Sequence, residues 1–126
     1  MENYTEKDLQ AIGSLMIKNS LRVIENPEGE GWIMYNFEKD KTVGKVYPSV
    51  TETKIGLIRD EIPTWGSKGI SSMEYFLKSS GRMDDLVNNL NSTLLNQIDE
   101  MVKNKKNITR EQAITLMIIH QGQIKN

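Results

Sequence analysis

The apolar residues at the start of the chain have the spacing of a helix. They recur at intervals of one, three and four residues, at Leu9, Ile12, Met16 and Ile17. This spacing places them along one side of an amphipathic helix. Thr5 followed by Asp8 is a helix-start signal, because the side chain of each can bond the backbone N–H of the other. We therefore predict an N-terminal helix that contains Gly13.

From Leu21 the pattern changes to short runs of strand-favouring residues that are separated by turns. The runs are 21–24, 32–37 and 42–47, and the turns between them are 26–31 and 38–41. Aromatic and β-branched residues dominate the second and third runs, and Pro48 ends the last one. We predict an antiparallel meander of three strands. A fourth strand is expected within 53–59, although a helix also fits those residues.

The second half of the chain has helical signals. Residues 60–69 are expected to form a structured loop, after which Ser71 with Glu74 predicts a helix start and Gly81 its end. A longer helix should begin near Met83 with one apolar seam: Met83, Val87, Leu90, Leu94, Ile98 and Met101. Thr109 with Gln112 predicts the start of a last helix, which is expected to run to Gln121 and stop at Gly122.

This last helix is apolar around most of its circumference. Residues 113–119 read A-I-T-L-M-I-I, and only Thr115 interrupts them. A helix that is apolar all round has to be enclosed, either in a core or between subunits. In a short chain a seam between subunits is the simpler solution. We therefore expect a homo-oligomer, most simply a dimer, that forms through the C-terminal helices.

Composition indicates one ordinary globular domain over residues 1–126, strand-rich at 20–60 and helical at 71–122. The fold class expected is α+β, in which a small antiparallel sheet packs against a C-terminal helical half. The 126 residues include 16 basic and 17 acidic side chains and no cysteine. This balance disfavours a general nucleic-acid binder, and the lack of cysteine excludes disulfides and thiolate metal sites. The chain begins with polar residues and has no membrane-length apolar run, so we expect a cytoplasmic protein.

The best candidate for chemistry is the segment 64–72, which combines glycines, hydroxyl groups and a lysine immediately before a predicted helix. Backbone N–H groups at such a place favour an anion. Two arginines nearby in the sequence could add contacts to phosphate or carboxylate. The candidate ligand-binding residues are Arg59, Trp65, Ser67, Lys68, Gly69, Ser71 and Arg82. The spacing matches no nucleotide-binding signature, and a glycine-permitted turn from sheet to helix is the simpler interpretation.

Other motifs favour structural roles. His120 is the only histidine and lies in an apolar helix, so it is interpreted as a half-buried helix residue rather than a ligand or a pH-sensitive contact. Adjacent acidic pairs such as Asp84 with Asp85 diverge on a helix and do not form a catalytic dyad. Glu28 and Glu30 lack the ligand set of a calcium loop. No catalytic residue, metal ligand or cofactor is predicted.

The function expected from these observations is non-enzymatic binding. The chain is expected to act as an oligomer by stoichiometric capture or inhibition of a partner protein or of a small anionic, nucleotide-like ligand. Its composition is also common among mobile genetic elements. Two alternatives stay open. One is an enzyme acting on phosphorylated small molecules through Lys68, Arg59 and Asp60, and the other is a DNA-binding regulator that uses Lys103, Lys105 and Lys106.

Overall fold

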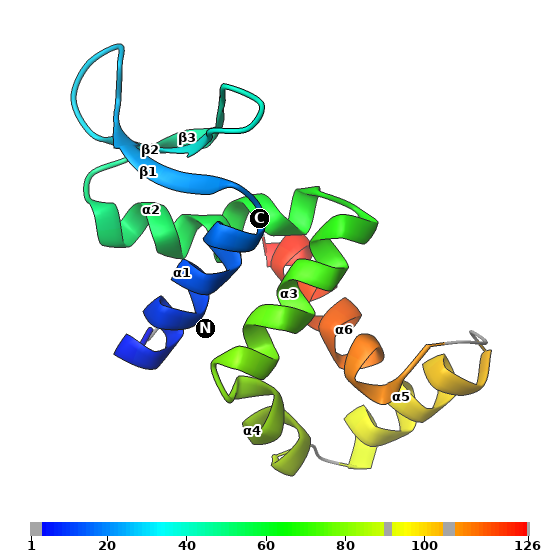
Figure 1. Ribbon diagram of the computed structural model, residues 1–126. Coiled ribbons are helices and arrows are strands. Elements are labelled where there is room, and N and C mark those ends of the chain that lie inside the picture. Colours follow the sequence, from blue (N-terminus) through cyan, green and yellow to red (C-terminus); the bar gives the residue numbers. More distant parts are fainter. Residues whose placement is uncertain (1–3, 90–91, 105–107, 126) are drawn as a thin grey trace.

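A three-stranded sheet and a set of helices form the α+β fold that the sequence predicts (Figure 1). The computed structural model describes residues 4–89, 92–104 and 108–125, with side-chain surroundings up to residue 120. The sheet lies at one end of the molecule beside α2, and α1 and α3 to α6 extend away from it. The elements are α1 (Glu6–Lys18), β1 (Leu21–Glu25), β2 (Trp32–Asn36), β3 (Lys41–Tyr47), α2 (Val50–Gly56), the π-helical turn η1 (Leu57–Glu61), the 3₁₀ turn η2 (Ile62–Thr64), α3 (Ser67–Ser79), α4 (Arg82–Asn88), α5 (Ser92–Asn104) and α6 (Arg110–Lys125).

Helix α1 begins at the predicted residues. The Thr5 hydroxyl accepts from the backbone N–H of Asp8 at 3.2 Å, and the Asp8 carboxylate accepts from the backbone N–H of Thr5 at 2.7 Å. The apolar face that α1 turns to the core is formed by Ala11, Ile12, Leu15 and Met16. Ile17 is 79% exposed, so its expected place in the apolar stripe is wrong. The stripe is centred on Ile12 and Leu15, and Ile17 lies outside it.

The three predicted strands pair as an antiparallel meander in the order β1-β2-β3. Val23 lies opposite Met34, and Met34 lies opposite Val43. Together with Leu21 these side chains pack into the same core as α1 and α3. The face of the sheet that carries Val23, Met34 and Val43 is therefore the one that packs into the core.

Residues 53–59 are helical, so the expected fourth strand is wrong. Helix α2 starts after Ser49, whose hydroxyl accepts from the backbone N–H of Glu52 at 3.0 Å. Thr53 is buried and donates its hydroxyl to the Ser49 carbonyl at 2.7 Å. Gly56 lies so close to the Tyr47 ring that a Cβ there would overlap it. The chain thus folds back as a helix that packs on the last strand.

The predicted start of the next helix is also wrong. Helix α3 begins at Ser67, after Gly66 with φ of 70°, and the loop expected over residues 60–69 is divided among the turns η1 and η2 and the first residues of α3. Ser71 therefore lies inside the helix, where its hydroxyl donates to the Ser67 carbonyl at 3.4 Å rather than capping the helix start. Gly81 follows the helix in the left-handed conformation, with φ of 82°, as predicted for its end.

The long helix expected from Met83 is interrupted. Helix α4 ends at Asn88, and the Asn89 side-chain amide donates to the Asp85 carbonyl at 2.7 Å. Of the expected seam, Met83 and Ile98 are buried, whereas Val87 is 37% exposed and Leu90 lies outside the described residues. The apolar spacing in the sequence continues past Asn88, but Asn89 ends the helix there.

Helix α6 has the predicted capping box, because Gln112 and Thr109 bond each other's backbone N–H at 2.9 and 3.1 Å. It continues through Gly122 to Lys125, so the expected stop at Gly122 is wrong. Contacts with α3, α5 and η2 hold it within the chain. The buried positions on it are Ala113, Ile114, Thr115 and Ile119, whereas Leu116, Met117 and Ile118 are half-buried. None of the described helices is long and apolar enough to cross a membrane.

Candidate functional site

A pocket of about 320 Å³ lies between the sheet and the start of α3. One wall comes from the sheet, its β2–β3 turn and Asn19 before β1, and the other comes from Trp65 and the first turn of α3. The pocket combines apolar side chains with three lysines. We call it the lysine pocket, and its lining is Asn19, Leu21, Asn36, Lys39, Lys41, Thr42, Val43, Trp65 and Lys68. A concave apolar site with a few convergent polar groups is the usual form of a small-ligand site.

The β2–β3 turn places two of these lysines beside acidic neighbours that are engaged elsewhere. Asp40, which has φ of 54°, accepts a hydrogen bond from the Tyr35 hydroxyl. Glu38 accepts one from the Ser20 hydroxyl at 2.9 Å. Lys39 and Lys41 lie next to these acids in the sequence but form no ion pair with them.

The cations of the lysine pocket are therefore available to a ligand. Within the described parts of the chain, no carboxylate lies at ion-pair distance from Lys39, Lys41 or Lys68. All three residues are exposed. An anion in this pocket would meet positive charge from both walls, although the whole chain has a net charge of −1.

Backbone contacts hold Trp65 in place just before the start of α3. Its backbone N–H donates to the Ile62 carbonyl at 3.0 Å, and its half-buried indole packs against the core. Gly69 lies against the same Ile62 carbonyl, and a Cβ at this position would overlap that oxygen. The Lys68 ammonium group lies over the indole ring, 6.0 Å from its centroid, in a cation–π contact. The aromatic ring and the cation are therefore within reach of one small ligand.

Arg59 does not line the lysine pocket. Its guanidinium group binds Asp60 with two hydrogen bonds of 2.9 and 2.8 Å. Asp60 also accepts from the Tyr47 hydroxyl at 2.8 Å, and Lys45 lies 3.6 Å away. The hydrogen bond from Arg59, aided by that from Tyr47, lowers the pKa of Asp60 to about 2. Burial and the bond to Asp60 raise the pKa of Tyr47. This cluster joins β3 to η1.

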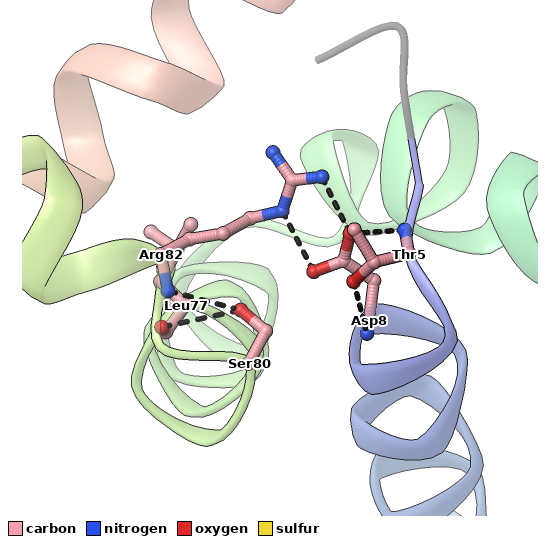
Figure 2. A network of polar contacts seen from close by, with 5 residues as sticks. All are labelled: Thr5, Asp8, Leu77, Ser80 and Arg82. Carbon is pink, nitrogen blue, oxygen red and sulfur yellow. Dashed lines mark hydrogen bonds and ion pairs between the residues drawn. The ribbon is translucent and has the colours of Figure 1, made fainter.

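Arg82 is also committed to an internal contact (Figure 2). Its guanidinium group binds the Asp8 carboxylate at 2.9 and 2.6 Å, and the same carboxylate bonds the backbone N–H of Thr5. The backbone N–H of Arg82 donates to the Ser80 hydroxyl at 3.3 Å. The hydrogen bond from Arg82 lowers the pKa of Asp8. The expected ligand contact from Arg82 is thus replaced by an ion pair between α1 and α4.

The described lining of the lysine pocket contains only two of the seven candidate ligand-binding residues. Trp65 and Lys68 line the lysine pocket, whereas Ser67 and Ser71 are exposed on α3 outside its described lining, and Gly69 is buried against η2. Sequence reasoning missed the sheet wall, formed by Asn19, Asn36, Lys39, Lys41 and Thr42. The alternation of acid and base in 38–41 was the available signal, and it was interpreted only as a turn.

Glu61 is a half-buried acid outside the lysine pocket. Burial and the neighbouring Asp60 raise its pKa. Its carboxylate lies against Gly44, where φ is 79° and a Cβ would overlap it. The space beside Glu61 is therefore filled by β3.

Other candidates from the sequence give no site among the described residues. His120 is exposed, Glu28 and Glu30 lie in the exposed β1–β2 turn, and no group of acids and histidines is placed to hold a metal ion in the parts described. Lys103 is exposed on α5, whereas Lys105 and Lys106 lie outside the described residues. A larger hollow, of about 620 Å³, has its described lining on α5 alone. The lysine pocket is therefore the better-formed site.

Comparison with known proteins gives no family, no curated protein and no solved structure that matches this chain. The functional argument therefore depends on the lysine pocket itself.

Proposed function

We propose that this protein is a non-enzymatic binding protein that captures a small anionic ligand in the lysine pocket. The observation that carries the proposal is the set of three lysines without carboxylate partners among the described residues, gathered around one pocket beside Trp65. Charge-assisted contacts from several ammonium groups are the usual way to hold a phosphate or carboxylate. Of the two captured partners that the sequence leaves open, this pocket favours the small ligand over a protein.

Capture is favoured over catalysis by the chemistry of the lining. The ionisable groups that line the lysine pocket are all lysines, so its described lining offers no pair of acid and base groups. The enzyme alternative requires Arg59 and Asp60 to act with Lys68. These two residues bind each other and do not belong to the described lining.

The oligomer expected from α6 remains part of the proposal. Contacts inside the chain bury Ala113 and Ile114, whereas Leu116, Met117 and Ile118 stay half-buried. A second copy that packs on these residues would remove the remaining apolar surface from water. Light scattering at micromolar concentration should give the mass of a dimer. A monomer mass would contradict the assembly and leave the ligand proposal standing.

The experiment for the proposed function separates capture from turnover. The purified protein is incubated with a mixture of nucleotides, sugar phosphates and small carboxylates, freed of unbound molecules, and denatured. Mass spectrometry of the released fraction should recover an unchanged anion at about one per chain. A converted product that accumulates beyond this stoichiometry would show an enzyme and contradict the proposal.

A further inference from the structure

The floor of the lysine pocket is apolar. An inorganic anion has no apolar part that could pack against this floor. Leu21 is buried, Val43 and Trp65 are half-buried, and all three belong to the pocket lining. Covering such a floor is favourable only for a ligand with an apolar part of its own. The positive charges lie on exposed side chains around it. The pocket therefore fits a molecule with a flat apolar portion and an anionic portion.

Two asparagines of the lining add hydrogen-bonding groups of opposite kind. Asn19 donates its side-chain amide to the Leu15 carbonyl at 2.9 Å, and its side-chain oxygen, which takes no part in that bond, can accept. Asn36 uses its side-chain oxygen to accept from the backbone N–H groups of Glu38 and Lys39 at 3.1 and 2.9 Å. Its NH₂ group remains able to donate. Nucleobase edges carry donors and acceptors side by side, which such a pair can satisfy.

The number of cations indicates how much negative charge the ligand carries. Lys39, Lys41 and Lys68 supply three positive charges from two walls. A phosphate group carries roughly 1.5 to 2 negative charges at neutral pH, so about two phosphates match three lysines better than one does. The volume of about 320 Å³ lies near the lower end for small-ligand sites, which favours a single nucleotide over a nucleic-acid strand.

We infer that the captured ligand is a nucleotide with at least two phosphates, whose base stacks on Trp65 while its phosphates bind the three lysines. This inference depends on the proposed function, because it names the class of anion that the lysine pocket holds. The 6.0 Å separation between the Lys68 ammonium group and the Trp65 ring centroid places both groups within the length of one nucleotide. Base stacking on an aromatic side chain adds affinity without selecting a base.

The test compares nucleotides, which carry a base and phosphates, with pyrophosphate, which carries the phosphates alone. Isothermal titration calorimetry is run with ADP, GDP, CDP and UDP, with pyrophosphate as the anion without a ring, and with a short single-stranded oligonucleotide. At least one nucleoside diphosphate should bind about tenfold or more tightly than pyrophosphate. W65L should remove this advantage and leave pyrophosphate binding unchanged, whereas W65F keeps a ring and should retain most of it. Urea midpoints of both variants show that they remain folded.

Each other outcome overturns a different statement. Pyrophosphate binding as tightly as all four nucleotides would overturn the inference about the base and leave anion capture in place. Tighter binding of the oligonucleotide than of any mononucleotide would overturn it in favour of a nucleic-acid strand. Failure of every probe to bind would overturn the nucleotide inference. The proposed function would then also fail unless the recovery experiment yields another intact anion.

Discussion

Arg82 at the start of α4 forms a two-bonded ion pair with Asp8 at the start of α1, across 74 positions of sequence. The Asp8 side chain is only 3% exposed, and the Arg82 side chain is 22% exposed. The pair fastens the N-terminal helix to the helical half. A second arginine, Arg59, forms an ion pair with the adjacent Asp60. Both arginines expected to bind the ligand therefore have structural partners, and the lysines of the β2–β3 turn and α3 remain for it.

Loss of Arg82 should destabilise the fold strongly. R82A leaves a buried carboxylate without its ion-pair partner, and we expect a loss of about 2 to 4 kcal/mol in the free energy of unfolding. Urea unfolding followed by circular dichroism measures this. The matched control is R110A, because the Arg110–Asp99 pair is 49% and 56% exposed and should be worth less than about 1 kcal/mol. Equal losses in the two variants would contradict the role given to the buried pair.

Stability should fall in acid. The folded state lowers the pKa of Asp60 from 3.8 to about 2 and also lowers that of Asp8. Both groups therefore stabilise the fold fully above the unfolded pKa near 4, and this contribution is lost as the pH falls toward 2. Urea midpoints between pH 5 and pH 2 should decrease over this window. D60N should decrease less steeply over it, and an unchanged slope in D60N would contradict the assignment.

Ionisation of Glu61 should destabilise the fold, in contrast to that of Asp60 and Asp8. Because burial and Asp60 raise its pKa, the charged carboxylate is disfavoured in the fold, and its unfavourable contribution grows as the pH rises above the unfolded value of 4.5. E61Q should therefore melt at a higher temperature than the unmodified protein at pH 7. The difference should shrink as the pH falls below the unfolded value of 4.5, because the Glu61 carboxyl then becomes protonated in both states. A lower melting temperature for E61Q at pH 7 would show that its carboxylate stabilises β3 instead.

Two glycine-to-alanine changes should have opposite effects. G69A places a Cβ on the Ile62 carbonyl oxygen, so we expect a loss of about 1 to 3 kcal/mol and a shift of the adjacent Trp65. G13A meets no atom within 4 Å inside α1 and should stabilise the fold by about 0.5 to 1 kcal/mol. Thermal melts measure both. If G69A weakens ligand binding and G13A does not, the turn η2 affects the lysine pocket. If G69A is as stable as the unmodified protein, the close packing of Gly69 against the Ile62 carbonyl is contradicted.

Local chemistry predicted much of the fold. The Thr5–Asp8 and Thr109–Gln112 capping boxes and the three strands depend on neighbouring residues, and all of them are confirmed. The sequence also held a helix-start signal that our prediction for residues 53–59 did not use. Ser49 with Glu52 after Pro48 is a helix start, and it decides residues 53–59 in favour of helix.

The remaining features of the fold and the site could not be predicted, because they depend on contacts between segments that are distant in the sequence. Nothing near Arg82 in the sequence indicates that its partner is Asp8, and the polar spacing of 64–72 cannot show that its other wall is the β2–β3 turn. Ser71 with Glu74 had the pattern of a helix start but lies within α3, because Gly66 allows the helix to begin earlier. Candidate site residues on one segment were found, and those contributed by a second segment were not.

The most direct measurement compares two triple variants in equilibrium dialysis with the nucleoside diphosphates and pyrophosphate at physiological ionic strength. K39Q/K41Q/K68Q removes the cations of the lysine pocket. K7Q/K54Q/K103Q removes the same charge from lysines outside its lining, so the two variants have equal net charge. The pocket variant should lose at least about a hundredfold in affinity, because each lost charge-assisted contact costs about 1.5 to 3 kcal/mol. The control should stay within about twofold, since distant surface charges are screened. Equal losses in the two variants, or full binding by the pocket variant, would contradict capture by the lysine pocket.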